Sequence, residues 1–346
     1  MHLLKAIIGG ASSYVVPEKE LQATGCFKHL SVKRTTREHL CDSGLQHLKN
    51  NLATCLYENG VDVALTTENK ASGNLIALAM PDAIASMLPL TTRFISLLML
   101  QECSENTKMR ERATNRALNA HFVGGWQEAL PTLPGQSTAL STSINRSYSM
   151  LRRSAAVKSL VHPIINDLLA TDHSKAQRVL ETWLKHFHDA ITAPEAPESN
   201  MGLDEYIRLS EGPAKKRAWT ATLYFALGVH LHESELGLVQ PVMESALDSI
   251  TLTEDYWGWP TISQSANNVK RLSNVVAFSM AEHQCSDAEA KDFVKGAVVA
   301  AQSRVRERKE AVIEGVGEGT SEVVLFLDAL EHFAAGNSIW CSTVRD

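Results

Sequence analysis

The chain has 346 residues, of which 44% are hydrophobic and 21% charged, and its formal net charge is −6. This composition describes a globular protein with a sizeable core, and the acidic balance gives no reason to expect nucleic acid as a partner. No apolar run approaches the roughly 20 residues that span a bilayer, and residues 1–11 lack the layout of a targeting peptide. We therefore expect a cytoplasmic protein with no membrane span.

Residues 1–38 form the least regular part of the sequence and carry its weak strand signals. Helical spacing begins after them, since apolar side chains recur every three or four residues from Leu45 to Leu56. The strongly apolar stretch 81–103 predicts a helix that starts near Pro81 and is buried on most sides. Further helices are predicted over residues 107–121, 145–170, 174–191, 204–232, 234–258, 264–284, 286–314 and 319–337.

Proline and glycine mark the expected breaks between these helices. Residues 130–143 and 193–201 are predicted to be loops, and the pair Gly212-Pro213 is predicted to kink or interrupt the helix 204–232. No internal repeat and no low-complexity segment divides the chain. We predict one all-α domain over residues 1–346.

The segment 254–259, which reads EDYWGW, is the most informative feature of the sequence. It resembles the second metal motif of class I terpene synthases, which in the fungal branch that makes di- and sesterterpenes reads N-D-Y-W-S-W-x-x-E. The aromatic frame is kept, but the three ligand positions read Glu254, Gly258 and Ile262. Spacings of four put these positions on one helical face, and Gly258 and Ile262 supply none of the oxygen ligands that a hard cation needs.

Five other fragments resemble the fusicoccadiene-type terpene synthases of fungi, in the same order along the chain. They are TGCF with a following L-x-V-K in 24–33, GN and MP in 73–81, DEY in 204–206, NVV in 274–276, and AGN with WC in 335–341. The resemblance implies a class I terpene synthase-like helical barrel around an apolar pocket. Such a pocket would take a small hydrophobic terpenoid as its substrate.

The resemblance also locates the catalytic positions, and several of them are changed. The first metal motif, normally D-D-x-x-D or D-D-x-x-E, falls on Gln101, Glu102 and Glu105, so its leading ligand is lost. The arginine that senses the diphosphate is replaced by Ser210, and the nearby Arg208 is turned to another face. Ionisation of an allylic diphosphate concentrates charge on the leaving group, and losing one stabilising donor raises such a barrier by about 3–4 kcal/mol. We therefore expect no metal site, no cofactor and no turnover of a prenyl diphosphate.

A barrel without metals can still hold a flexible molecule in a reactive conformation, which lowers the barrier of an intramolecular reaction. We therefore expect a metal-independent cyclase that forms a norbornene by an intramolecular Diels–Alder cycloaddition of an oxidised diterpene. The expected catalytic residues are Gln101, Arg208, Ser210 and Tyr256. The expected substrate-binding residues are Phe94, Leu98, Glu102, Glu105, Trp257, Asn337 and Trp340. Trp259 and Phe278 are expected in the core.

Two other functions fit the same residues. One is an unusual class I cyclase that acts on a prenyl diphosphate and recruits magnesium through Glu102, Glu105, Glu254 and Asp255. The other is a non-catalytic carrier of a hydrophobic terpenoid. Magnesium dependence would distinguish the diphosphate cyclase from the cycloaddition enzyme. Turnover of a purified intermediate would distinguish the cycloaddition enzyme from the carrier. The protein could also form a homodimer.

Overall fold

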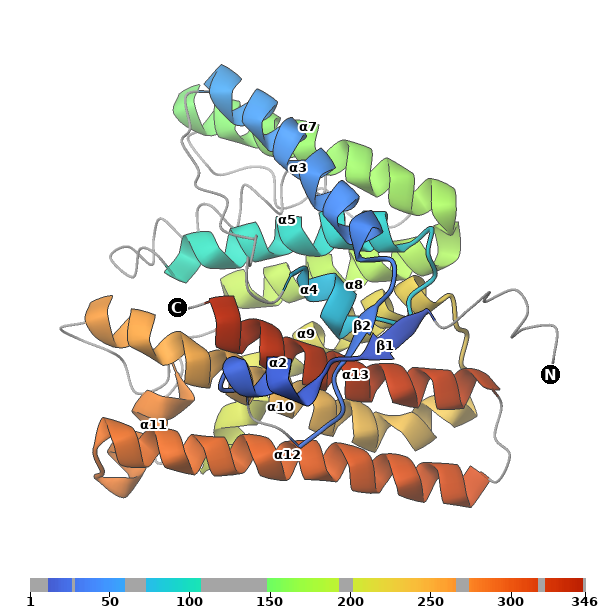
Figure 1. The fold of residues 1–346 in the computed structure, drawn as a ribbon. Helices are drawn as coiled ribbons and strands as arrows, with labels where there is room; N and C mark the ends of the chain where they lie inside the picture. The colour runs from blue at the N-terminus through green and yellow to red at the C-terminus, as the bar shows by residue number, and fades with distance from the viewer. Residues whose placement is uncertain are drawn as a thin grey trace.

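A computed structural model describes residues 12–26, 29–59, 73–106, 148–192, 202–265, 274–316 and 321–344. Within these ranges the protein is helical apart from a small sheet of two strands (Figure 1). The elements in chain order are β1 (Ser13–Val15), α2 (Glu18–Ala23), β2 (Lys33–Thr35), α3 (Glu38–Asn59), α4 (Leu75–Ala79), α5 (Leu88–Asn106), α7 (Tyr148–Thr171), α8 (His173–Thr192), α9 (Leu203–Leu227), α10 (Glu233–Ser265), α11 (Val275–His283), α12 (Asp287–Val316) and α13 (Ser321–Val344). The prediction of an all-α protein whose strands lie near the N-terminus is confirmed.

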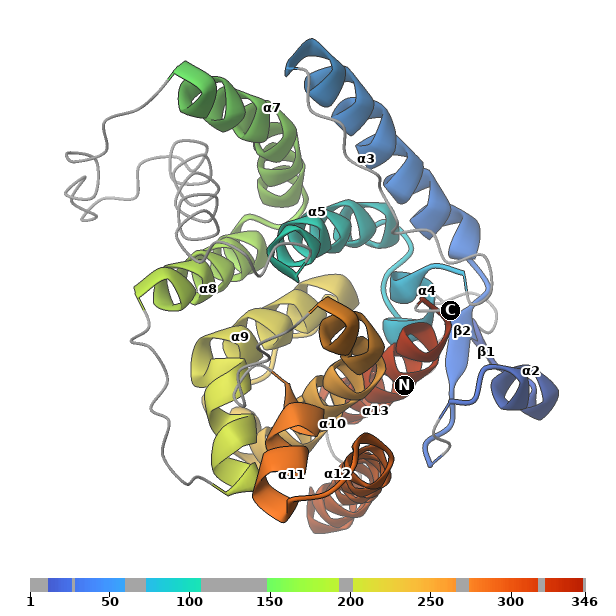
Figure 2. The ribbon, with the colours of Figure 1, turned by 90° about the vertical axis from the view of Figure 1, so that its left-hand side faces the viewer.

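Helix α10 organises one half of the molecule, because it packs against α9, α11, α12 and α13. In the other half, α3 and α7 lie outside α5, and α8 packs along α9 (Figure 2). Strands β1 and β2 are antiparallel, with Ser13 opposite Thr35, and β2 contacts both α4 and α13. The N-terminal segment is thereby attached to the C-terminal helix.

The entry to α5 differs from the prediction. A short helix, α4, comes first, and it begins where the side chain of Asn74 accepts a hydrogen bond from the Ile76 N–H at 3.0 Å. Turns then occupy much of residues 81–87, so α5 begins at Leu88 and not near Pro81. A tertiary contact explains the delay: the Ile84 N–H donates to the carbonyl of Ala226 at 2.9 Å. This bond ties the turn to the end of α9, which the local sequence does not reveal.

The boundary between α9 and α10 also moves. Helix α9 ends at Leu227, before the predicted residue 232, because Gly228 adopts the left-handed conformation with φ 68°. Helix α9 continues without interruption through Gly212-Pro213, and its axis bends along its length (Figure 2). Helix α10 extends past the predicted residue 258 to Ser265. The predicted helix 107–121 and the predicted loops 130–143 and 193–201 lie outside the described residues.

Buried side chains form two clusters that meet along α10. The first cluster fills the space enclosed by α4, α5, α8, α9 and α13. The second cluster lies between the first turns of α9, the second half of α10, and helices α11 and α12. Helix α10 therefore connects the interior of the barrel with an outer layer of helices. Among the described residues, no helix is long and apolar enough to cross a membrane.

Candidate functional site

The carboxylate of Asp255, in the EDYWGW segment of α10, forms hydrogen bonds within the protein. Its Oδ2 accepts from the hydroxyl of Tyr206 at 2.7 Å and from the backbone N–H of Val275 at 2.8 Å. The backbone carbonyl of Asp255 accepts from the side chain of Asn274 at 2.8 Å. Because Asn274 is the N-cap of α11, these bonds join α9, α10 and the start of α11. This carboxylate holds three helices together.

Of the three ligand positions of the motif, only position 254 carries a carboxylate in the sequence. The carboxylate of Glu254 lies 3.8 Å from the ammonium of Lys215 on α9. Gly258 has no side chain, and the side chain of Ile262 lies outside the described residues. In the part of the chain that the structure describes, no group of three or more His, Cys, Asp or Glu side chains could hold a metal ion.

The aromatic residues of the segment take different positions. Trp259 is buried in the second cluster, and its indole N–H donates to the side chain of Asp287. Tyr256 is half-buried, and the ammonium of Lys291 on α12 lies 4.7 Å from the centre of its ring. Burial raises the pKa of Tyr256, and the nearby Asp292 and Asp287 raise it further. Tyr256 therefore lies on the α12 side of α10.

Trp257 lies where the two clusters meet. Its ring packs against both clusters and makes an edge contact with Tyr256 at 5.1 Å between ring centres. Gly25, from the TGCF fragment near the N-terminus, lies beside this ring, and a Cβ there would be in ordinary van der Waals contact with it at 3.9 Å. Phe278 is buried in the second cluster beside Tyr206. The core positions expected for Trp259 and Phe278 are confirmed.

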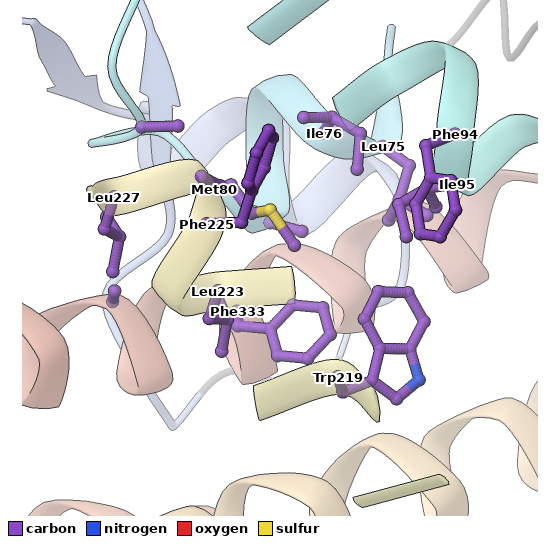
Figure 3. Close-up of a cluster of buried hydrophobic side chains, with 14 of the residues drawn as sticks. Leu75, Ile76, Met80, Phe94, Ile95, Trp219, Leu223, Phe225, Leu227 and Phe333 are labelled. Atoms are coloured by element: carbon purple, nitrogen blue, oxygen red, sulfur yellow. The ribbon is translucent and has the colours of Figure 1, made fainter. Parts of the chain in front are cut away.

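An aromatic wall runs through the first cluster. Phe94 of α5 contacts Trp183 of α8 at 6.3 Å between ring centres, and Trp183 contacts Trp219 of α9 at 5.4 Å. Trp219 in turn lies 5.0 Å from Phe333 of α13. Figure 3 shows Phe94, Trp219 and Phe333 in this arrangement. Leu98, one helical turn beyond Phe94, is buried in the same cluster. Four helices therefore contribute aromatic side chains to one buried apolar cluster.

Two buried N–H donors lie on α13 next to this wall. Asn337 follows Phe333 by four residues and Trp340 follows Asn337 by three, so all three share one face of the helix. The Nδ2 atom of Asn337 and the Nε1 atom of Trp340 are buried and have no hydrogen-bond acceptor among the described residues. On α5, the hydroxyl of Thr91 is also buried without a partner, three residues before Phe94. Buried donors without acceptors are rare in proteins, so this surface has unused capacity to bind an oxygen atom.

Sequence comparisons relate the chain to fungal terpene synthases. No family model matches it. It is 23% identical over 335 residues to a bifunctional terpene synthase of Fusarium proliferatum, which covers 94% of this chain and 41% of that protein. It is 24% identical over 203 residues to the fusicoccadiene synthase of Phomopsis amygdali, which covers 57% of this chain and 28% of that protein. The chain spans less than half the length of these curated relatives.

A comparison with solved structures decides the fold. Germacradien-4-ol synthase from Streptomyces citricolor matches with a TM-score of 0.62 at 16% identity, over 92% of this chain and 98% of that chain. The fold is that of the class I terpene synthases. The barrel expected from the sequence is confirmed.

Within this terpene synthase-like barrel, the expected site residues fall into three groups. Phe94, Leu98, Asn337 and Trp340 belong to the interior cluster or its wall. Tyr256 packs against the second cluster, and Trp257 packs against both clusters. The side chains of Gln101, Glu102 and Glu105 at the end of α5, and of Arg208 and Ser210 in α9, lie outside the described residues.

The sequence analysis missed three residues of the wall and one polar group. They are Trp183, Trp219, Phe333 and Thr91. The signal for Trp183 was present, because Val179, Trp183 and Phe187 recur at a spacing of four along α8. That spacing predicts a buried face of α8, but it does not predict which other helices pack against this face.

Proposed function

We propose that the protein is a terpenoid cyclase that catalyses an intramolecular Diels–Alder cycloaddition of an oxidised diterpene without a metal ion. The observation that carries this proposal is the pair of buried N–H donors without acceptors, Asn337 Nδ2 and Trp340 Nε1, beside an aromatic wall. A pure hydrocarbon has no oxygen that could accept from them. A terpenoid that bears a carbonyl group does, and the rest of its body fits an apolar interior.

The reaction suits this surface because it needs no acid, base or leaving group. The diene and the alkene exchange three π bonds for two new C–C σ bonds and one new π bond, and no proton or electron is transferred to the protein. A hydrogen bond to the carbonyl on the alkene withdraws electron density from it and favours the transition state. Each neutral donor contributes roughly 1–3 kcal/mol, judged by the cost of leaving such a group unpaired.

Conformational restraint supplies the larger share of the rate acceleration. A flexible substrate must fold so that both pairs of reacting carbons meet, and holding it in that geometry lowers the barrier by several kcal/mol. Phe94, Trp183, Trp219 and Phe333 form a rigid surface from four helices, against which only some folded conformers fit. Trp340 extends this surface and carries one of the donors.

The state of the acidic residues supports chemistry without magnesium. The carboxylate of Asp255 is engaged by Tyr206 and Val275, and that of Glu254 by Lys215. The similarity to fungal terpene synthases supports a role in terpenoid biosynthesis in general. A cyclase of prenyl diphosphates and a terpenoid carrier are the alternatives that the experiment must separate.

The first experiment mixes purified protein with an oxidised diterpene that carries a diene and an α,β-unsaturated aldehyde, with and without excess chelator. We expect the cyclised product to form faster than in buffer, at the same rate in both samples. A parallel sample holds geranylgeranyl diphosphate and magnesium. Release of pyrophosphate that stops on adding chelator would establish the diphosphate cyclase in place of our proposal, and tight binding without acceleration would establish the carrier.

Variants then test the two donors. Asn337→Leu keeps the size of the side chain and removes the N–H, so it should slow the reaction roughly tenfold or more. Gln302→Leu is the matched control, because Gln302 of α12 is also a buried amide without hydrogen-bond partners and lies outside the wall. Trp340→Ala should slow cyclisation more than Gln101→Ala does, because it removes both a donor and part of the wall. Equal effects of Asn337→Leu and Gln302→Leu would refute the assignment of the donor.

A further inference from the structure

Two adjoining hollows lie on the surface between α8, α9 and α10, away from the barrel interior. They share Arg178, Ala221 and Tyr224 as lining residues. The larger one has a volume of about 140 Å³ and extends along α10 over Leu236, Val239 and Met243. We refer to the two hollows together as the α8–α10 groove.

The groove lies on the opposite side of α9 from the aromatic wall. Each residue turns a helix by about 100°, so Trp219 and Leu223 share one face, while Arg217, Ala221 and Tyr224 share the other. Trp219 lies in the wall, and Arg217 and Tyr224 line the groove. A molecule in the groove therefore contacts the outer face of α9 and does not enter the barrel interior.

Positively charged side chains line the groove, and Glu235 lies close enough to act on Tyr224 without lining either hollow. The guanidinium groups of Arg178 and Arg217 line its larger hollow, and neither has a carboxylate partner in the described part of the chain. No acidic residue lines either hollow. Lys175, at the other end, forms an ion pair with Asp172 at 2.8 Å and adds no free charge. Two arginines without partners at one hollow favour an anionic ligand, and guanidinium groups match carboxylates in shape.

The floor of the groove has a buried hydroxyl without a partner. Tyr224 is only 6% exposed, and its hydroxyl forms no hydrogen bond within the part of the chain that the structure describes. Its ring stacks on Phe326 of α13 at 4.5 Å, which fixes its position, and the guanidinium of Arg178 lies 5.8 Å from the ring centre. Burial raises the pKa of Tyr224 and the nearby Glu235 raises it further, and together they outweigh the opposite effect of Arg178. The phenol therefore stays neutral and remains a hydrogen-bond donor.

We propose that the α8–α10 groove binds a small amphipathic monocarboxylate. Arg178 and Arg217 bind its carboxylate, Tyr224 donates a further hydrogen bond, and Leu236, Val239 and Met243 of α10 contact its apolar body. The apolar side of the groove distinguishes this ligand from a free inorganic anion. The guanidinium groups distinguish it from a neutral lipid. This site is independent of the cyclisation proposed above.

Binding is measured by calorimetry with three probes: octanoate, octanol, and pyrophosphate. We expect octanoate to bind, and both octanol and pyrophosphate to bind at least roughly tenfold more weakly, because each lacks one half of the recognised chemistry. Octanol binding as tightly as octanoate would overturn the proposal, since the arginines would then play no part. Pyrophosphate binding more tightly than octanoate would overturn it as well, in favour of a plain anion site.

Variants place the binding in the groove. Arg178→Gln and Arg217→Gln should each weaken octanoate binding by roughly tenfold. Tyr224→Phe, which keeps the stacked ring, should weaken it several-fold. Arg304→Gln on α12 removes an arginine outside the groove and should leave binding unchanged. Unchanged binding in both Arg178→Gln and Arg217→Gln would show that octanoate binds elsewhere, and no binding to the native protein would refute the site. Neither result bears on cyclisation.

Discussion

Replacing Asp255 by alanine should destabilise the protein, because two buried donors lose their acceptor at once. Tyr206 is 3% exposed and Val275 is fully buried, and both donate to the same carboxylate oxygen. An unsatisfied buried donor costs about 1–3 kcal/mol. A water molecule can enter the space left by the carboxylate and recover part of this cost. We therefore expect the free energy of unfolding to fall by about 2–4 kcal/mol.

Urea unfolding followed by circular dichroism measures this loss, with Glu254→Ala as the matched control. Glu254 is the neighbouring acid of the same motif, but its ion pair with Lys215 is longer and partly exposed, so its removal should cost about 1 kcal/mol or less. Cyclisation by folded Asp255→Ala protein should continue at low temperature. The reasoning is refuted if Asp255→Ala is as stable as the native protein and yet inactive, because the carboxylate would then act in the chemistry.

Three further predictions concern packing, pH and metals. Gly336→Ala should lower the free energy of unfolding by about 1–3 kcal/mol or more, because a Cβ at this position would lie 2.2 Å from the backbone oxygen of Leu78; an unchanged melting temperature would contradict the close approach of α13 and α4. Burial opposes ionisation of Asp82, but its hydrogen bond and ion pair with His332 outweigh this and hold its pKa below the ordinary 3.8. The stabilisation from Asp82 is therefore present above pH 3.8 and is lost as the pH falls through the lowered pKa; urea titrations should show this loss in the native protein and not in Asp82→Asn, and identical pH profiles would contradict it. Dialysis against a chelator should change neither the melting temperature nor the cyclisation rate, and a loss of either would point to a bound metal.

The sequence predicts the helical layers well because their cause is local. Apolar side chains at helical spacing mark the buried faces of α5 and α8, and the positions 254, 258 and 262 share one face wherever the helix lies. The same reasoning fails at the start of α5, where the bond from Ile84 to Ala226 joins residues far apart in the chain. It fails again at α4, since five residues with one cap are too few to produce a periodic signal.

The candidate site is less predictable, because its roles depend on partners that are distant in sequence. In the sequence Asp255 is part of a metal-binding motif, but in the structure its carboxylate accepts hydrogen bonds from Tyr206 and Val275. Tyr256 belongs to the same conspicuous segment as Trp257, yet it lies against Lys291 of α12. The unpaired donors of α13 cannot be inferred from spacing, since the absence of an acceptor is a property of the whole fold.

The ion pair between Glu254 and Lys215 matters for any attempt to build a cation site at positions 254, 258 and 262. Substituting Gly258 by serine and Ile262 by glutamate would return oxygen atoms to two corners of a cation site. The third corner would still face an ammonium group 3.8 Å away, and an incoming cation would have to displace that charge. Lys215 of α9 is therefore the residue to replace together with Gly258 and Ile262 in such a design. Removing that ammonium group should cost little stability, because the ion pair is partly exposed.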